Sequence, residues 1–278
     1  MNVILKIIVF FVVFVIVGTL VVGYLSIKPK RHKMEVSPAE YGFDYEKVSF
    51  LTSDGIKLSG WLVHSKENSK KVIILCHGYG CSKQDMLEFS WLSEKFNLLL
   101  FDFRAHGESE GGFTSHGWLE FRDVIAAANF LRNKGYNEIG GFGISLGAAV
   151  LLLAADQSNL KALVVDSPYA SLEQMITRTF KFPLLKNVFG FAGRLIARLL
   201  RVNLEEVKPA QKVKEIKAPL LIIHGKFDSF IPVEDAKLIH RNANNAILWI
   251  VEAEHAQSYF VKRTEYKERV IAFFNKNL

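Results

Sequence analysis

The sequence predicts an α/β domain built on a mostly parallel sheet with helices on both faces. Short, continuous apolar runs alternate with longer mixed segments along most of the chain, and such runs are typical of parallel strands buried on both sides. Half of the 278 residues are hydrophobic and 23% are charged, which is the composition of a globular chain. About 250 residues remain after an apolar N-terminal segment, enough for one large domain with a buried core.

The expected elements alternate between strands and helices. The strands are expected at residues 47–52, 56–64, 72–76, 97–103, 139–142, 160–166, 220–224 and 246–251. The helices are expected at residues 84–95, 118–133, 146–155, 233–242 and 259–275. The first two strands meet at Asp54-Gly55, a strong hairpin signal that makes this pair antiparallel. The sequence contains no internal repeat.

The N-terminal segment is predicted to be a retained transmembrane anchor. Residues 7–25 form an almost unbroken apolar run, which as a helix would be roughly 28 Å long, close to the thickness of a bilayer core. No small-x-small cleavage site follows it, as a signal peptide would require. We therefore expect an anchor at residues 1–27, a polar, proline-containing linker at residues 28–44 and a catalytic domain at residues 45–278.

The charge pattern bears on the side of the membrane and on the partners. Four basic residues follow the apolar run closely: Lys28, Lys30, Arg31 and Lys33. Only Lys6 and the amino terminus precede it, so the positive-inside rule favours a cytoplasmic domain at the cell membrane. The net charge of +7 lies largely beside this run and in a later helix, which favours an anionic membrane surface over nucleic acid.

The two cysteines, Cys76 and Cys81, form no disulfide framework and no zinc motif. We expect them to be reduced, which agrees with a cytoplasmic domain. A local disulfide or a reactive thiol remains an alternative.

Residues 168–217 fit no strand–helix unit and are predicted to form a short helical cap near the carboxyl ends of the strands. Two helices are expected there, at residues 171–182 and 184–201, broken at Pro183. The second helix carries an apolar stripe beside arginines. This helix either packs on the core or covers an apolar substrate or the membrane surface.

The most informative motif is Gly-Phe-Gly-Ile-Ser-Leu-Gly at residues 141–147, which places Ser145 between an expected strand and an expected helix. This is the context of a nucleophile elbow. Side chains at Gly143 and Gly147 would collide where the strand and helix approach. The helix that follows directs free N–H groups at any anion formed beside Ser145.

A serine hydroxyl needs a nearby base, and a carboxylate to orient that base. Asp228 and His255 follow the two last expected strands, so both lie in loops at strand ends. Asp166 also ends a strand and is the alternative acid. Glu254 is next to His255 in the sequence, but neighbouring residues of a loop point in different directions, so Glu254 is not expected to be its partner. Three further histidines, at positions 77, 106 and 224, are interpreted as structural.

Four segments in order resemble serine hydrolases of the α/β-hydrolase superfamily, including membrane-anchored bacterial members similar to serine aminopeptidases and esterases. They are His-Gly-Tyr-Gly at 77–80, Asp-Phe-Arg-Ala-His-Gly-Glu-Ser at 102–109, the elbow, and the acid and base loops. The resemblance implies the α/β-hydrolase fold from about residue 45 onward. It implies Ser145 as nucleophile, His255 as general base and acid, Asp228 as orienting carboxylate, and the N–H groups of Tyr79 and Leu146 as oxyanion hole.

The resulting hypothesis is a membrane-anchored hydrolase for a carboxylic ester or thioester of an apolar acyl group, with a lipid-like substrate as one candidate. It requires no metal or organic cofactor. One alternative is an aminopeptidase-like peptide hydrolase. An alternative of another class is a non-catalytic binding or scaffolding module, since fold alone does not establish function.

Overall fold

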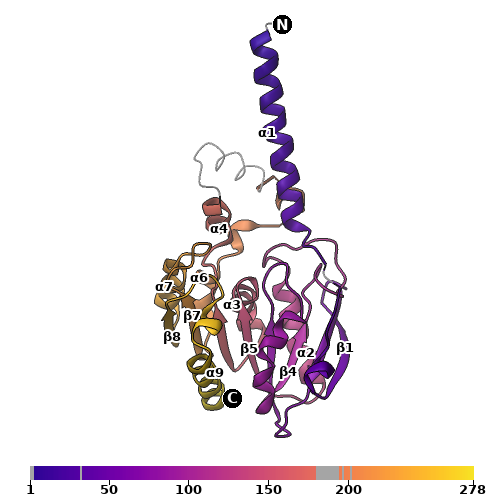
Figure 1. Cartoon of the computed structure of the whole chain (residues 1–278), viewed down its shortest axis with the longest axis vertical. Helices are drawn as coiled ribbons and strands as arrows, with labels where there is room; N and C mark the ends of the chain where they lie inside the picture. The colour runs from indigo at the N-terminus through magenta and orange to yellow at the C-terminus, as the bar shows by residue number, and fades with distance from the viewer. Residues whose placement is uncertain (1–2, 32, 180–193, 196, 201) are drawn as a thin grey trace.

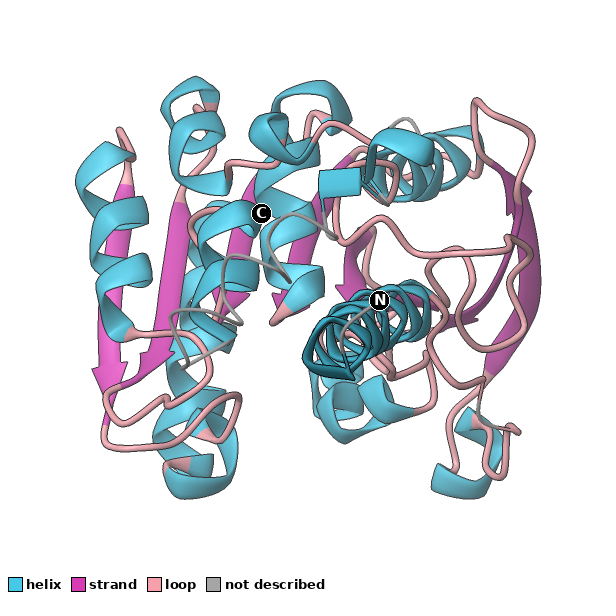
Figure 2. Cartoon of the chain, turned by 90° about the horizontal axis from the view of Figure 1, so that it is seen from above, coloured by secondary structure: helices cyan, strands magenta, loops and turns pink. Residues whose placement is uncertain are grey.

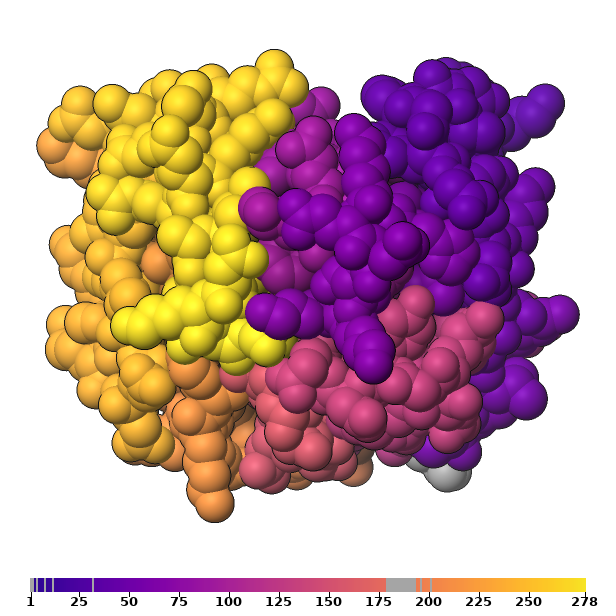
Figure 3. All heavy atoms as spheres, turned by 90° about the horizontal axis from the view of Figure 1, so that it is seen from below, coloured from indigo at the N-terminus to yellow at the C-terminus, as the bar shows by residue number. Residues whose placement is uncertain are grey.

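A long N-terminal helix stands away from an α/β domain in the computed structural model (Figure 1). The structure describes residues 3–31, 33–179, 194–195, 197–200 and 202–278. The helices of the domain cover both faces of its sheet, as Figure 2 shows from above. Seen from below, C-terminal residues in yellow lie beside purple residues of the first half of the chain (Figure 3). Beneath this surface, the buried rings of Phe96 and Phe274 pack together, with centroids 6.0 Å apart.

The eight strands described form one sheet in the order β1-β2-β4-β3-β5-β6-β7-β8. They are β1 Tyr45–Leu51, β2 Lys57–Val63, β3 Lys71–Cys76, β4 Asn97–Phe101, β5 Glu138–Ile144, β6 Ala162–Asp166, β7 Leu220–Gly225 and β8 Ala246–Val251. Strand β2 runs antiparallel to β1 and to β4. All pairings from β4 through β8 are parallel. The prediction of a mostly parallel sheet with an antiparallel N-terminal hairpin is confirmed.

Helical elements pack on both faces because alternate strand residues bury in opposite directions. The described elements are α1 Val3–Ile27, η1 Pro38–Tyr41, η2 Asp85–Glu94, α2 Phe121–Asn133, α3 Leu146–Ser158, α4 Leu172–Thr179, η3 Leu204–Glu206, α6 Pro209–Lys212, η4 Val213–Glu215, α7 Val233–Asn242, α8 Ser258–Val261 and α9 Arg263–Asn277. Val72 and Ile74 of β3 join a core with α2, α3, α6 and α7. Ile73 and Leu75 join the opposite core with η2, α8 and α9.

Two expected helices differ from the prediction. The helix expected at residues 84–95 is present at residues 85–94, as a 3₁₀ helix. The buried positions recur every three residues, in the pairs Met86-Leu87, Phe89-Ser90 and Leu92-Ser93, and this period matches the three residues per turn of a 3₁₀ helix. The expected C-terminal helix divides into α8 and α9 at Lys262, whose φ of −125° and ψ of 44° are not helical.

The predicted cap is described only in part. Its first helix begins near the expected place, as α4, and η3, α6 and η4 lead from the cap to β7. Residues 180–193 lie outside the described residues. The expected break at Pro183, and most of the second expected cap helix, fall there.

Helix α1 is long and apolar enough to cross a membrane, with Leu5–Ile27 as the candidate span. Only 6% of its most apolar window is buried against the protein, so it is not a core helix. A signal sequence meets the same criterion.

The turn between β5 and α3 depends on two glycines. A Cβ atom on Gly147 would lie 2.1 Å from the carbonyl oxygen of Cys76, and one on Gly143 would lie 2.6 Å from the carbonyl carbon of Gly147. Backbone atoms cannot yield as a flexible side chain can, so any side chain here forces β3, β5 and α3 apart.

We therefore predict that Gly147→Ala destabilises the chain by at least about 2 kcal/mol, as overpacking at a rigid site does. Gly112→Ala is the matched control, because nothing lies within 4 Å of a Cβ at Gly112. The denaturant midpoint of the full chain in detergent is the measurement. Equal midpoints for the two variants would contradict the packing argument.

Candidate active site

Ser145 occupies the tight turn between β5 and α3 in a strained backbone conformation. Its φ is 53° and its ψ is −113°, a region that non-glycine residues adopt only when the surroundings enforce it. Its N–H donates to the carbonyl of Asp166 at 2.8 Å, and its carbonyl accepts from Ala149 N–H at 3.1 Å. The half-buried serine is therefore fixed on both sides of its Cα.

The structure brings Ser145, Asp228 and His255 together from three loops. Nδ1 of His255 lies 2.6 Å from Oδ2 of Asp228, and Nε2 lies 2.9 Å from Oγ of Ser145. An ionised carboxylate only accepts hydrogen bonds, so Nδ1 carries the proton. Nε2 of the neutral ring is then free to accept the serine hydroxyl proton. The arrangement can deprotonate a serine that attacks an electrophile.

The acid loop is braced independently of His255. Oδ1 of Asp228 accepts from the N–H groups of Phe230 and Ile231 at 3.0 and 2.7 Å. Nε2 of buried His224 donates to the carbonyl of Ile231 at 2.9 Å. Burial lowers the pKa of His224, which keeps its ring neutral. The interpretation of His224 as a residue that holds this loop is confirmed.

The other two carboxylates considered from sequence have different partners. Asp166 accepts from the hydroxyl of Tyr266 and from that of Ser167, each at 2.9 Å, and burial raises its pKa to about 6. Glu254 accepts from the backbone and hydroxyl of Ser229 at 3.3 Å. Asp166 therefore ties β6 to α9, and Glu254 points to the acid loop instead of to His255.

The loop after β3 lies against the nucleophile. A Cβ on Gly78 would meet the Cβ of Ser145 at 3.7 Å. His77 holds this loop, because its Nε2 accepts from Phe103 N–H at 3.0 Å while Nδ1 donates to the carbonyl of Gly78 at 2.7 Å. Burial lowers the pKa of His77 to about 4, so the ring stays neutral. Tyr79 follows this braced position.

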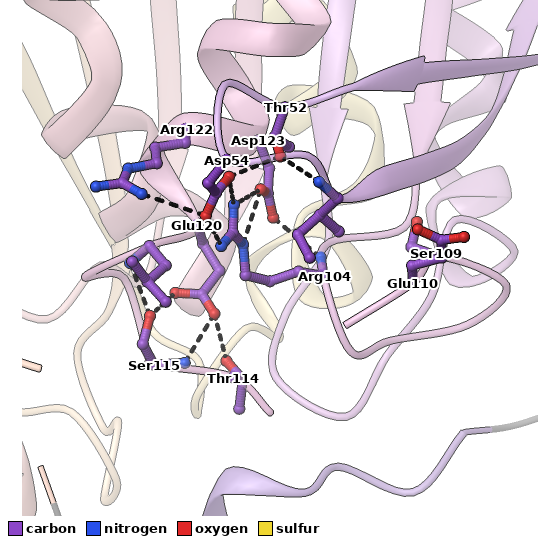
Figure 4. A network of polar contacts seen from close by, with 12 residues as sticks. Thr52, Asp54, Arg104, Ser109, Glu110, Thr114, Ser115, Glu120, Arg122 and Asp123 are labelled. Atoms are coloured by element: carbon purple, nitrogen blue, oxygen red, sulfur yellow. Dashed lines mark hydrogen bonds and ion pairs between the residues drawn. The ribbon is translucent and has the colours of Figure 1, made fainter. Parts of the chain in front are cut away.

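A buried ionic network holds the loop between β4 and α2 (Figure 4). The guanidinium of Arg104 lies between two carboxylates, with Asp123 at 2.6 Å and Asp54 at 2.7 Å. The Asp54 contact is bidentate, since the second guanidinium nitrogen lies 3.0 Å from the other oxygen. The Arg104 side chain holds the pKa of Asp54 well below its usual range. The network joins the β1–β2 hairpin to the loop that carries His106.

Two buried residues that the sequence analysis did not single out shape this region. Lys83 is fully buried, with its ammonium 2.5 Å from Asp102 and 2.7 Å from Glu108. Glu120 is also fully buried and accepts from the backbone N–H groups of Ser115 and Gly117. Lys83 has no local sequence signal, because its two carboxylate partners lie 19 and 25 residues away. The partners of Glu120 lie within six residues of it.

A cavity of about 740 Å³ opens at Ser145 and His255. Its walls are mainly apolar and include Leu87, Met175 and Phe260. This volume suits a small organic substrate. In the part of the chain that is described, no cluster of three or more His, Cys, Asp or Glu residues could hold a metal ion.

Both cysteines are free thiols. Cys76 is buried, and burial raises its pKa well above the usual value. Burial also raises the pKa of Cys81 to about 11. Thiols of this kind are poor nucleophiles near neutral pH, so the reactive-thiol alternative loses its support, and the local disulfide is absent.

Residues 73–255 match the model of the alpha/beta hydrolase family. This range contains most of β3, all of β4 to β8 and the three residues brought together above. The chain therefore belongs to the alpha/beta hydrolase family. The resemblance and the fold expected from the sequence are confirmed.

Particular relatives agree with this assignment. The chain is 30% identical to the Bacillus subtilis protein YqkD, with 83% of this chain and 80% of the relative covered. It is 26% identical to the Arabidopsis thaliana alpha/beta hydrolase domain-containing protein WAV2, with 79% and 74% covered. The structure of the Pyrococcus furiosus esterase Pf2001 superposes with a TM-score of 0.75 at 29% identity, with 90% of this chain and 99% of the esterase covered. This esterase-like fold supports hydrolase activity.

The Arg104–Asp54 contact predicts a pH-dependent stability. The pKa of Asp54 is lower in the folded chain than the value near ~3.9 of an unfolded chain. Its contribution is complete at neutral pH and declines as the pH falls below about 4. We expect Asp54→Asn to lower the free energy of unfolding at pH 7 by about 1–2 kcal/mol.

The difference between the variant and the natural chain should shrink as both are acidified from pH ~4 toward pH ~3, because Asp54 takes up a proton in the unfolded chain while it stays ionised beside Arg104 in the folded chain. Asp156→Asn, at an exposed aspartate of α3, is the control and should leave stability unchanged. Denaturant unfolding at several pH values is the measurement. A constant difference at every pH would argue against a charge-dependent role for Asp54.

Proposed function

We propose that this chain is a membrane-anchored serine hydrolase that cleaves a carboxylic ester through an acyl-enzyme on Ser145. The observation that carries the proposal is the continuous line of hydrogen bonds from Asp228 through His255 to Ser145, at 2.6 and 2.9 Å. This line opens into an apolar cavity. The likeness to an esterase structure over 90% of the chain agrees with an ester as substrate.

In the proposed mechanism, Oγ of Ser145 attacks the acyl carbonyl carbon while Nε2 of His255 takes the hydroxyl proton. Asp228 stabilises the resulting imidazolium. The ester C–O bond then breaks, and His255 returns the proton to the leaving alcohol. Water, deprotonated by the same His255, attacks the acyl-enzyme, releases the carboxylic acid and restores Ser145.

The oxyanion of each tetrahedral intermediate requires donors beside Ser145. We assign this role to the backbone N–H groups of Tyr79 and Leu146. Leu146 is the first residue of α3, and the first N–H groups of a helix have no partner within it. Tyr79 follows Gly78, which lies against Ser145. Each such donor is typically worth about 3 kcal/mol of transition-state stabilisation.

The alternatives differ in what supports them. A thioester uses the same steps, with a thiol as leaving group. The aminopeptidase-like alternative uses the same three residues on a peptide bond, and the apolar walls of the cavity favour an acyl chain over a peptide. The scaffolding alternative would be favoured if Ser145 and His255 lay beyond hydrogen-bond distance of each other. Their separation is 2.9 Å, so the geometry does not favour that alternative.

The test is hydrolysis of p-nitrophenyl esters of increasing acyl length by the full chain in detergent. We expect turnover that falls about a thousandfold or more in Ser145→Ala, as removal of a catalytic serine does. Labelling by a fluorophosphonate should be lost in the same variant. Ser53→Ala, at an exposed serine of the β1–β2 hairpin, should retain both properties.

Ser145-dependent labelling without ester turnover would support Ser145 as the nucleophile but contradict an ester as the substrate. Thioesters and peptides would then be tested as substrates. A folded chain that shows neither labelling nor turnover would contradict the serine hydrolase mechanism.

A further inference from the structure

The end of α1 is held by the loop that borders the cavity. The carbonyl of Ile27 accepts from Thr114 N–H at 2.8 Å. Nε2 of His116 lies 3.0 Å from the carbonyl of Ser26, which can only accept, so the ring donates. The last carbonyls of a helix have no partners within it. Here the catalytic domain supplies two, so α1 is fixed to the domain at its last turn.

The loop that receives α1 is shaped in advance by Glu120. This buried carboxylate accepts from Ser115 N–H and from the hydroxyl of Thr114, each at 2.8 Å (Figure 4). It also accepts from Gly117 N–H at 2.7 Å. None of these bonds involves α1. The donors at Thr114 and His116 are therefore held in place by the domain itself.

The chain that follows α1 continues along the same surface. The guanidinium of Arg31 donates to the carbonyls of Ser109 and Gly111 at 2.5 and 2.8 Å. Oε1 of Gln84 accepts from Glu35 N–H at 2.6 Å and from Val36 N–H at 3.0 Å. The polypeptide between the anchor and η1 is thus bound at several points, which limits how far the domain can move from the end of α1.

This docked chain forms part of the cavity wall. Ser26 of α1 and Val36 line the same cavity as Ser145 and His255. His116, which binds α1, stacks on Tyr79 with ring centroids 5.0 Å apart. The last turn of the apolar helix and the nucleophile therefore face one space.

Aromatic side chains that line this cavity also reach its surface. Four of them are 41–57% exposed: Tyr41, Tyr79, Phe230 and Phe260. An exposed apolar patch on a soluble surface is unfavourable and commonly marks a lipid or protein contact. Here the patch adjoins the end of a helix long and apolar enough to cross a bilayer, which makes lipid its neighbour.

We propose that the site takes acyl esters of bilayer lipids, which enter the cavity directly from the membrane that α1 crosses. This inference rests on the proposed function and on retention of α1. Because Ser26 lies in the last turn of the apolar span, the bilayer boundary lies within about one helical turn, 5.4 Å, of the cavity wall. The acyl chain passes from lipid to apolar wall without crossing water. Ser145 then takes the acyl group, and the lipid alcohol leaves with the proton from His255.

The test uses the full chain in vesicles of phosphatidylcholine and phosphatidylglycerol. One substrate is water-soluble p-nitrophenyl butyrate, and the other is a phosphatidylglycerol in the same bilayer with a self-quenched fluorescent acyl chain. A flexible Gly/Ser insertion of about 12 residues between residues 27 and 28 lets the domain move roughly 20 Å from α1. The control places the same insertion between residues 67 and 68, in the exposed loop from β2 to β3, which precedes the amino end of β3, whereas Ser145 follows the carboxyl end of β5.

We expect the natural chain to hydrolyse both esters. The insertion after residue 27 should lower the ratio of lipid to soluble turnover by about tenfold or more, because it lowers the effective concentration of bilayer ester at the site. The control insertion should leave the ratio unchanged. An unchanged ratio in both variants, or soluble turnover by the natural chain without lipid turnover, would overturn the inference.

A single substitution tests the same inference independently, in case the insertion variant does not fold. Arg31→Ala removes the Arg31 contacts to the loop at residues 109–111 and should lower the same ratio, whereas Arg269→Ala, which removes an exposed ion pair on α9, should not. Equal ratios for these two variants would count against the inference. Absence of Ser145-dependent turnover on both esters would instead refute the proposed function itself.

Discussion

The close approach of α3 to the end of β3 is the constraint on which the rest of the site depends. The backbone of Gly147 lies so near the carbonyls of Cys76 and His77 that a Cβ would sit 2.1 and 2.7 Å from them. This contact brings the start of α3 and the loop after β3 to one point. Ser145 is then forced into its positive φ. The strain at the serine is sustained by packing in the core, not by the serine itself.

The parallel sheet brings the other two groups to this point. Strands β7 and β8 are neighbours, so the loops at their carboxyl ends meet. The two loops bind each other directly, since Lys226 N–H donates to the carbonyl of Val251 at 2.6 Å and Phe227 N–H to that of Ala253 at 3.0 Å. The relative position of the acid and base loops is therefore set by backbone hydrogen bonds that need no substrate. Such preorganisation is what transition-state stabilisation requires.

Local patterns in the sequence predicted the sheet and the meeting of the three site loops, because apolar strands and glycine spacing are local signals. The helix expected at residues 84–95 is present at residues 85–94, and its 3₁₀ form was not predicted, because it goes with burial at every third position, which the packed sheet determines. Other features have no local signal. The buried ammonium of Lys83 binds Asp102, which is 19 residues away in the sequence. The carbonyl of Ser26 at the end of α1 accepts from His116, which is 90 residues away. Contacts at such separations are decided by the assembled fold, so they could not be derived from neighbouring residues.

The proposed acyl-ester site faces a physical conflict that the position of α1 would resolve. Its walls must be apolar to bind an acyl chain, but an apolar opening exposed to water costs about 25 cal/mol for each Å². A water-soluble hydrolase commonly reduces this cost with a lid that closes over the site. In this chain, the end of α1 already lies in the cavity wall, and exposed aromatic side chains line the same cavity. If the bilayer begins there, the lipid itself covers the opening. The loop shaped by Glu120 is then as much a part of the substrate path as the cavity, because it determines where the membrane meets the site.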